Sequence, residues 1–296
     1  MQILVFGATG LLGKALMREQ PHHSQVVGLG SRDADIRSPE QVKTALQQHK
    51  PDSIVLAAAY TDVDGCETHQ DLALSVNCEG AANVAKAAKE AGARVVFMST
   101  DYVFDGSKTT PYETNDPRRA RTVYGKTKAK AEERILELMP ECCIMRTSWV
   151  FGVGGKCFPD TILKLAASRS ELEVVDDQRG SPTYAVDLAR TIYRVIDRDA
   201  KGMVHVTNQG HCTWYEFAQE VVHAAGLSAS VLPTTSDKFV RPALRPKYSV
   251  LSPASLDELG IEMPPWRDAI RRYLLERADQ LAGLPVSTEA ARNQNK

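Results

Sequence analysis

The sequence has no long apolar run and no excess of charge of either sign. None of its apolar segments approaches the roughly 18–20 residues that a membrane-spanning helix needs. Lys and Arg total 36 against 37 for Asp and Glu, so the net charge of −1 favours neither nucleic acid nor an anionic membrane as a partner. The amino terminus shows no basic region or cleavage signal ahead of its first apolar run. We therefore expect a cytoplasmic protein.

Paired cysteines and metal-ligand spacings are also missing. The six cysteines are scattered at positions 66, 78, 142, 143, 157 and 212, and no two form a C-x-x-C pair. This pattern predicts reduced, mostly buried thiols, as in a reducing compartment. The seven histidines show no metal-ligand spacing, so we predict no metal site.

Short apolar runs alternate with helical stretches through the first half of the chain. We expect strands at 3–6, 26–29, 53–58, 94–99 and 142–147, and helices at 11–20, 39–49, 71–91 and 123–139. Continuous apolar strands that alternate with helices are typical of a parallel sheet covered on both faces. The fold class predicted is therefore α/β, with a doubly wound parallel sheet of the Rossmann type.

The pattern loosens after Phe151, where Gly- and Pro-rich loops separate helices expected at 159–170, 186–199, 213–225 and 266–281. A dinucleotide-binding domain is expected at 1–150 and a small C-terminal substrate-binding lobe, interleaved with the sheet edge, at 151–282. Residues 283–296 are polar and are expected to form a flexible tail.

A glycine-rich turn lies between the first strand and the first helix. Gly7, Gly10 and Gly13 have the spacing that permits a tight turn, lets backbone N–H groups approach a pyrophosphate and brings helix against sheet. The helix amino terminus adds a positive dipole end. A generic glycine turn is the alternative, but the strand–turn–helix context favours a dinucleotide site.

The end of the second strand bears on which dinucleotide binds. An NAD site usually has an acid there to bind the ribose hydroxyls. This chain has Ser31 and Arg32, which can hold a 2′-phosphate, followed by Asp33. The pattern favours NADPH over NADH, although Arg32 can also be an ordinary surface arginine.

Tyr124 and Lys128 are four residues apart on a predicted helix, so they project from one face. An ammonium beside a phenol lowers the phenol's pKa, which lets Tyr124 donate a proton to a carbonyl oxygen as hydride reaches the carbon. Lys128 can also hold the nicotinamide ribose. Thr100, at the carboxyl end of the fourth strand, can hydrogen-bond the same oxygen. A chance Y-x-x-x-K on a solvated helix face is the alternative.

These motifs resemble those of the extended short-chain dehydrogenase/reductase superfamily and, within it, the dTDP-4-dehydrorhamnose reductase family. The resemblance runs from residue 1 to about residue 281. The stretches that carry it are STDYVFDG at 99–106, AAAYTDV at 57–63, RTSWVFG at 146–152, DQRGSPT at 177–183, TWYEF at 213–217 and RPKYS at 245–249.

The resemblance implies a role for further residues. Thr100, Tyr124 and Lys128 would be the catalytic set. Cofactor contacts would come from Gly10, Leu11 and Leu12 at the pyrophosphate, Asp35 and Ile36 at the adenine, and Ala58, Ala59 and Tyr60 along the cofactor. The nucleotide sugar would contact Thr61, Val63, Tyr102 and Trp149, with Trp149 offering a flat surface to the thymine.

Departures from the family pattern limit what carries over. Tyr102 follows Asp101 where related dehydratases have a second acid, so dehydration is not expected. Ala15 replaces a glutamate used in magnesium-dependent dimers, so that dimer is not expected. Cys157 stands where the family usually has Asn, which puts one polar substrate contact in question. Arg118, Arg119 and Arg121 can grip a diphosphate or form a solvated loop.

The function implied by the resemblance is NADPH-dependent reduction of the C4 keto group of a nucleotide sugar. The simplest substrate is dTDP-4-dehydro-L-rhamnose, which would give dTDP-L-rhamnose. Two alternatives stay open: a non-catalytic NADP-binding regulatory partner, like the regulatory subunit of methionine adenosyltransferase, and a reductase of another nucleotide-linked keto sugar. The partners expected are the nucleotide sugar and, in the regulatory case, another protein. The chain would be a monomer or a homodimer not held by metal.

Overall fold

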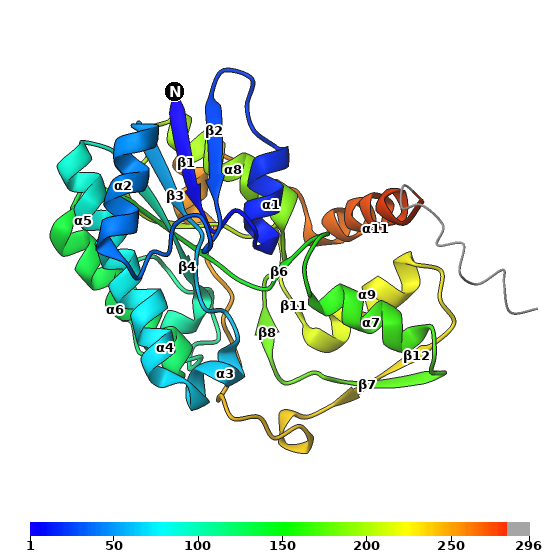
Figure 1. Cartoon of the computed structure of the whole chain (residues 1–296). Helices are drawn as coiled ribbons and strands as arrows, with labels where there is room; N and C mark the ends of the chain where they lie inside the picture. Colours follow the sequence, from blue (N-terminus) through cyan, green and yellow to red (C-terminus); the bar gives the residue numbers. More distant parts are fainter. Residues whose placement is uncertain (283–296) are drawn as a thin grey trace, which may run out of the picture.

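A computed structural model describes residues 1–282 of the chain (Figure 1). Its centre is a six-stranded sheet in which every pairing is parallel. The strand order is β10-β5-β4-β3-β1-β2. The strands are β1 (Gln2–Phe6), β2 (Gln25–Leu29), β3 (Ser53–Leu56), β4 (Arg94–Thr100), β5 (Cys143–Thr147) and β10 (Gly202–His205). The predicted doubly wound parallel sheet is confirmed.

Helices cover both faces of this sheet because successive strand residues point to opposite sides. Ile3 and Val5 of β1 pack in one core with α1 and α8, whereas Leu4 and Phe6 pack in a second core with α2, α5 and α6. The helices of this part are α1 (Leu11–Arg18), α2 (Pro39–His49), α3 (Val63–Thr68), α4 (Gln70–Leu74), the π-helix η1 (Ser75–Gly80), α5 (Ala81–Ala91), the 3-10 turn η2 (Asp101–Val103), α6 (Val123–Leu138), α8 (Ala185–Asp197) and α10 (Ala254–Asp257).

The strand order reverses beside β1, which pairs with β2 on one side and β3 on the other. Loops that leave the carboxyl ends of neighbouring strands diverge at such a point and open a crevice where ligands bind. The glycine turn after β1 lies at this reversal, so the fold places it where a dinucleotide site is expected.

A third core, separate from the two sheet cores, fills the C-terminal lobe. Its largest buried side chains are Phe151, Phe217, Trp266 and Tyr273. The elements of this lobe are β6 (Val150–Phe151), α7 (Phe158–Ala166), β7 (Glu171–Val175), β8 (Arg179–Gly180), β9 (Thr183–Tyr184), β11 (Cys212–Thr213), α9 (Trp214–Ala224), β12 (Ser230–Thr234), η3 (Ser236–Lys238) and α11 (Trp266–Ala282). Figure 1 shows α7, α9 and α11 grouped to one side of the sheet.

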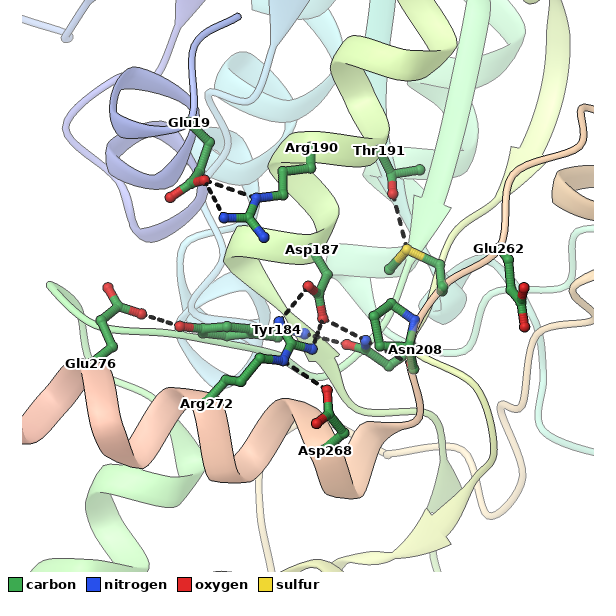
Figure 2. Close-up of polar contacts among 12 residues, drawn as sticks. Glu19, Tyr184, Asp187, Arg190, Thr191, Asn208, Glu262, Asp268, Arg272 and Glu276 are labelled. Atoms are coloured by element: carbon green, nitrogen blue, oxygen red, sulfur yellow. Dashed lines mark hydrogen bonds and ion pairs between the residues drawn. The ribbon is translucent and has the colours of Figure 1, made fainter.

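A polar network ties this lobe to the sheet layers (Figure 2). Asp187 of α8 accepts both arms of the Arg272 guanidinium of α11, each at 2.7 Å. Asn208 donates to the same carboxylate at 2.7 Å and accepts from the backbone N–H of Tyr184. Asp187 is only 4% exposed, so these partners satisfy a carboxylate that burial alone would destabilise.

Two differences between the observed and the predicted elements concern the sheet and the helices that cover it. The single helix expected at 71–91 is divided, because a π-turn spans Ser75–Gly80. Within it Asn77 accepts from the Tyr60 backbone N–H at 2.7 Å and donates to the Tyr60 carbonyl at 3.1 Å, a contact with a distant loop that local pattern does not reveal. The sixth strand, β10, was not predicted; it has four residues and comes from the C-terminal half.

Three further findings bear on the sequence predictions. No helix within residues 1–282 is long and apolar enough to cross a membrane. The same residues contain no group of three or more His, Cys, Asp or Glu that could hold a metal ion. All six cysteines are free thiols, five of them buried. The tail predicted at 283–296 lies outside the described residues.

Candidate active site

The glycine turn after β1 admits no side chain at two of its three glycines. Gly7 has a φ of +92°, and a Cβ there would lie 2.6 Å from the Ala58 backbone nitrogen. A Cβ on Gly13 would lie 2.1 Å from the Gly7 carbonyl oxygen. Gly10 is the N-cap of α1 and has no side-chain cap. The turn therefore brings bare backbone to the start of a helix, as a pyrophosphate requires.

A hollow of about 360 Å³ opens over this turn, at the carboxyl ends of β1, β2 and β3. It is lined by Gly7, Thr9, Gly10, Gly30, Ser31, Ala34, Asp35, Ile36, Arg37, Ala57, Ala58, Ala59, Leu72 and Val76. Seven residues predicted to contact the cofactor are among these: Gly7, Gly10, Ser31, Asp35, Ile36, Ala58 and Ala59. Leu11, Leu12, Gly13, Arg32 and Tyr60 are not. The bare turn and the hollow fit a dinucleotide.

The cation that lines this hollow is Arg37, which sequence reasoning missed. Its guanidinium forms an ion pair with Asp35 at 2.6 Å, and this pair holds the pKa of the Asp35 carboxyl below its ordinary value. Arg32, the predicted phosphate ligand, is exposed and does not line the hollow. The Asp33 carboxylate accepts from the Gly30 backbone N–H at 2.8 Å, so it caps its own loop.

The predicted catalytic residues meet where β4 ends and α6 begins. Thr122 caps α6 by accepting from the Gly125 backbone N–H at 3.0 Å. A Cβ on Gly125 would lie 2.1 Å from the Tyr102 carbonyl oxygen, so this glycine lets α6 approach the end of β4. As a result the Tyr124 phenol lies beside the Thr100 side chain, which acts to lower the pKa of the phenol, and the Tyr102 ring meets Tyr124 edge-on at 5.7 Å.

The environment of Tyr124 differs from the one expected from sequence. Burial raises the pKa of its phenol, and the contact with Thr100 only partly offsets that rise. The Lys128 ammonium, expected beside the phenol, instead donates to the Met98 carbonyl at 2.6 Å and lies 3.9 Å from the Phe97 ring centroid. Burial lowers the pKa of Lys128 to about 7. The apolar surroundings of both groups therefore outweigh their mutual electrostatic effect.

Asp101 is a further acid at this point, beside Thr100. It is 1% exposed, and its Oδ1 accepts from the Thr100 hydroxyl at 3.0 Å. Burial raises the pKa of this carboxyl to about 6, against hydrogen bonds from Ser249 and Thr100 that lower it. Within the described residues its Oδ2 has no hydrogen-bond partner.

The residues expected to contact the sugar nucleotide differ in exposure. Thr61 is exposed, Val63 begins α3, and Tyr102 is half-buried. Trp149 has a φ of +47° and stacks on Trp214, with ring centroids 3.5 Å apart. One face of the predicted thymine surface is therefore covered by a second indole.

A second hollow, of about 670 Å³, lies in the C-terminal lobe. Its lining combines apolar residues of α7 and β7 with Trp214 and three arginines, Arg169, Arg241 and Arg245. Sequence reasoning missed this site because its residues are scattered from 158 to 245. Arg245 also forms an ion pair at 2.8 Å with Asp64 of α3, which joins the rim of the hollow to the sheet side of the molecule.

Arg118 and Cys157, two positions at which the chain departs from the family pattern, contact other residues of the protein. Arg118 approaches Glu132 and Glu133 of α6, at 3.4 Å each, whereas Arg119 and Arg121 are exposed. The Cys157 thiol contacts the Gly152 carbonyl at 3.7 Å.

Comparison with known proteins places this chain among relatives of matching length. The family model described as RmlD substrate binding domain matches residues 1–278. The spore coat polysaccharide biosynthesis protein SpsK of Bacillus subtilis is 41% identical, over 94% of this chain and 98% of its own. The dTDP-4-dehydrorhamnose reductase structure from Clostridium acetobutylicum has a TM-score of 0.91 and 38% identity, over 94% of this chain and 100% of its own.

A further solved structure, dTDP-4-dehydrorhamnose reductase from Bacillus anthracis in complex with NADP, has a TM-score of 0.90 and 37% identity, over 93% of this chain and 99% of its own. The sequence, the fold and the site agree with these matches. The chain therefore belongs to the dTDP-4-dehydrorhamnose reductase family, the family described as RmlD substrate binding domain.

Proposed function

We propose that this protein reduces the C4 keto group of a nucleotide sugar with NADPH, and that it converts dTDP-4-dehydro-L-rhamnose to dTDP-L-rhamnose. The observation that carries the proposal is the meeting of Thr100 and Tyr124 at the carboxyl end of β4, with Lys128 one turn further along α6. This group serves carbonyl reduction, and its relatives carry that activity in their names.

The protein's residues supply the acid and the orientation for this reaction. A bound NADPH supplies the hydride that reaches the C4 carbon. The Tyr124 phenol donates its proton to the carbonyl oxygen, so the keto group becomes an alcohol. The phenol is protonated at neutral pH, the state needed in a proton donor, but its raised pKa makes it a weaker acid than the sequence predicted. When substrate binds, the Thr100 hydroxyl turns from Asp101 and donates to the oxygen as charge develops on it.

Two features support NADPH as the cofactor. Ser31 and Arg37 line the hollow at the end of β2, where no carboxylate is free to bind ribose hydroxyls, since Asp35 and Asp33 have partners of their own. The relative from Bacillus anthracis was solved with NADP. Comparing Arg32→Ala with Arg37→Ala for KM toward NADPH and NADH decides which arginine contacts the 2′-phosphate.

The second hollow suits the nucleotide of the substrate. Trp214 and the apolar side chains of α7 and β7 offer surfaces for a base. Arg169, Arg241 and Arg245 line the same hollow and can bind a diphosphate once it displaces Asp64 from Arg241 and Arg245. We place the base and diphosphate here, with the sugar extending toward Tyr124.

The test is NADPH oxidation by the purified protein against dTDP-, GDP- and UDP-linked 4-keto sugars. Fastest turnover of dTDP-4-dehydro-L-rhamnose is expected. Preference for another sugar would make the protein a reductase of a different nucleotide-linked keto sugar. Tight NADPH binding without turnover of any of them would instead indicate a regulatory NADP-binding partner. We further propose that the protein acts in the cytoplasm, as a monomer or as a homodimer not held by metal.

A further inference from the structure

Helix α6 contacts strand β4 on three successive turns of one face. Tyr124, Lys128 and Glu132 are spaced four residues apart, so their side chains share this face. Tyr124 lies beside Thr100, the Lys128 ammonium donates to the Met98 carbonyl at 2.6 Å, and Glu132 accepts from the Ser99 hydroxyl at 2.5 Å. The proposed reaction uses Tyr124 and Lys128. Glu132, one turn further along the same face of α6, makes a polar contact that the reaction does not use.

Glu132 is also joined to strand β5. Its two carboxylate oxygens accept from the Arg146 guanidinium, Oε1 from Nε at 2.9 Å and Oε2 from Nη2 at 2.7 Å. Glu132 is fully buried and Arg146 is 1% exposed. Arg146 also donates to the Thr114 carbonyl at 3.0 Å, in the loop before α6. One ion pair therefore links α6, β4, β5 and the loop that leads into α6.

Stability alone does not explain such a pair. Removing two charges from water is costly, and well-packed apolar residues of similar volume are often as stabilising as a buried ion pair. Apolar residues do not fix an orientation in the way that two directed hydrogen bonds do. The bidentate pair fixes the rotation of α6 about its axis and its position along β4. That rotation determines where Tyr124 and Lys128 point.

We propose that Glu132, held by Arg146 and Ser99, is a positioning residue for the catalytic face of α6. It sets the placement of Tyr124 against Thr100 and supplies the negative charge that keeps Lys128 cationic. This inference rests on the proposed function, because it assigns Glu132 a part in the same reaction.

The charge environment of Lys128 supports the second role. Burial lowers the pKa of Lys128 to about 7, and the Glu132 carboxylate, followed by the Cys78 thiol of η1, acts in the opposite direction. Strand β4 contributes only the Met98 carbonyl and the Phe97 ring to its surroundings. Loss of the Glu132 charge should therefore lower the pKa of Lys128 further, so that a larger fraction of Lys128 is neutral at pH 7.

The test replaces the ion pair by apolar residues in the double variant Glu132→Leu/Arg146→Met. The variant removes both members of the bidentate pair, Arg118 keeps Glu133 as a partner, and Lys128 can become neutral, so we expect the variant to fold, which a cooperative thermal transition checks. We expect kcat at pH 7 to fall by about tenfold or more. The alkaline limb of kcat/KM should move to lower pH by about one unit. At an effective dielectric constant of 20, the loss of a neighbouring charge is enough to change a pKa by about that much.

A matched control is the Asp187–Arg272 pair, which is also bidentate with a buried carboxylate but joins α8 to α11 (Figure 2). The Asp187→Leu/Arg272→Met variant should change Tm without moving the pH profile.

A second variant, Ser99→Ala, removes one contact of Glu132 and leaves the ion pair. It should lower kcat by about threefold to tenfold, as the loss of one hydrogen bond to a charged group predicts.

Wild-type kcat and an unmoved pH profile in both the double variant and Ser99→Ala would overturn the positioning role. The pH dependence of NADPH affinity, measured by protein fluorescence, gives a readout that needs no sugar substrate, because Lys128 is the proposed contact of the nicotinamide ribose. If the wild type turns over no 4-keto sugar, the proposed function fails. The inference is then decided by the pH midpoint of the NADPH affinity curve. A shift of this midpoint to lower pH in the double variant supports the role of Glu132, and an unchanged midpoint contradicts it.

Discussion

Trp214 of α9 lies flat against Trp149 of the loop after β5, with ring planes 8° from parallel. Trp149 has a left-handed backbone, a conformation that is uncommon outside glycine and that surrounding structure must hold in place. Phe158 and Phe217 pack against Trp214 and extend the aromatic group into the lobe core. The Trp214 indole, which lines the hollow proposed for the base, is thus held by Trp149 before the substrate arrives.

Gly180→Ala tests this aromatic arrangement. A Cβ on Gly180 would lie 2.5 Å from the Trp149 ring, so the indole must shift. We expect KM for the sugar nucleotide to rise by about tenfold while KM for NADPH stays unchanged, since the cofactor hollow lies elsewhere. Gly226→Ala, where a Cβ meets nothing within 4 Å but the φ is +65°, is the control for the backbone cost of replacing a glycine. An unchanged substrate KM in Gly180→Ala would remove Trp149 from the substrate site.

Tyr124→Phe tests the proton donor. Removing the phenol hydroxyl should lower kcat by about 10²–10⁴-fold, the usual contribution of a general acid, and leave NADPH affinity nearly intact. Stopped-flow hydride transfer and a fluorescence titration measure the two quantities. Tyr215→Phe, in which the lost hydroxyl bonds only Gln219, is a matched control that should keep full activity. A fully active Tyr124→Phe protein would exclude Tyr124 from the mechanism.

Ser31→Asp tests the cofactor preference. Ser31 lines the hollow over the glycine turn, and a carboxylate there repels a 2′-phosphate but can bind ribose hydroxyls. The ratio of kcat/KM for NADPH over NADH should fall by about 100-fold, which corresponds to roughly 2.7 kcal/mol. Equal use of NADH and NADPH by the wild type would contradict the preference itself.

The glycine turn and the start of α6 were predictable because local pattern determines both. Gly7 needs its positive φ, and Gly125 lets α6 approach Tyr102, whatever else the chain does. The doubly wound fold and the family were predicted from such patterns and are confirmed. The catalytic and substrate roles stay predictions.

Contacts between distant segments could not be predicted in the same way. Arg118 pairs with Glu132 and Glu133 of α6, acids that only the fold brings near it. Lys128 donates to Met98 since the buried ammonium needs an acceptor. The hollow of the C-terminal lobe depends on residues of several elements, so no single stretch of sequence indicates it.

His205 should make the fold sensitive to mild acid. It is 2% exposed, and burial lowers its pKa to about 3 from an ordinary value of 6.5. Between those values the unfolded chain binds a proton that the folded protein does not, so stability is lost as pH falls. From about pH 7 to about pH 5 the wild type should lose about 1–2 kcal/mol more unfolding free energy than His205→Gln. Urea unfolding at both pH values measures this, and equal losses would show that His205 titrates normally.

The most direct measurement of the central claim follows the hydride itself. The protein is incubated with dTDP-4-dehydro-L-rhamnose and NADPH carrying deuterium at the transferred position of the nicotinamide, and the product is examined by NMR. The account predicts dTDP-L-rhamnose with a single deuterium at C4, and almost none in the same period with Tyr124→Phe. A wild-type reaction that leaves the label in the cofactor, or places it elsewhere in the sugar, would contradict it.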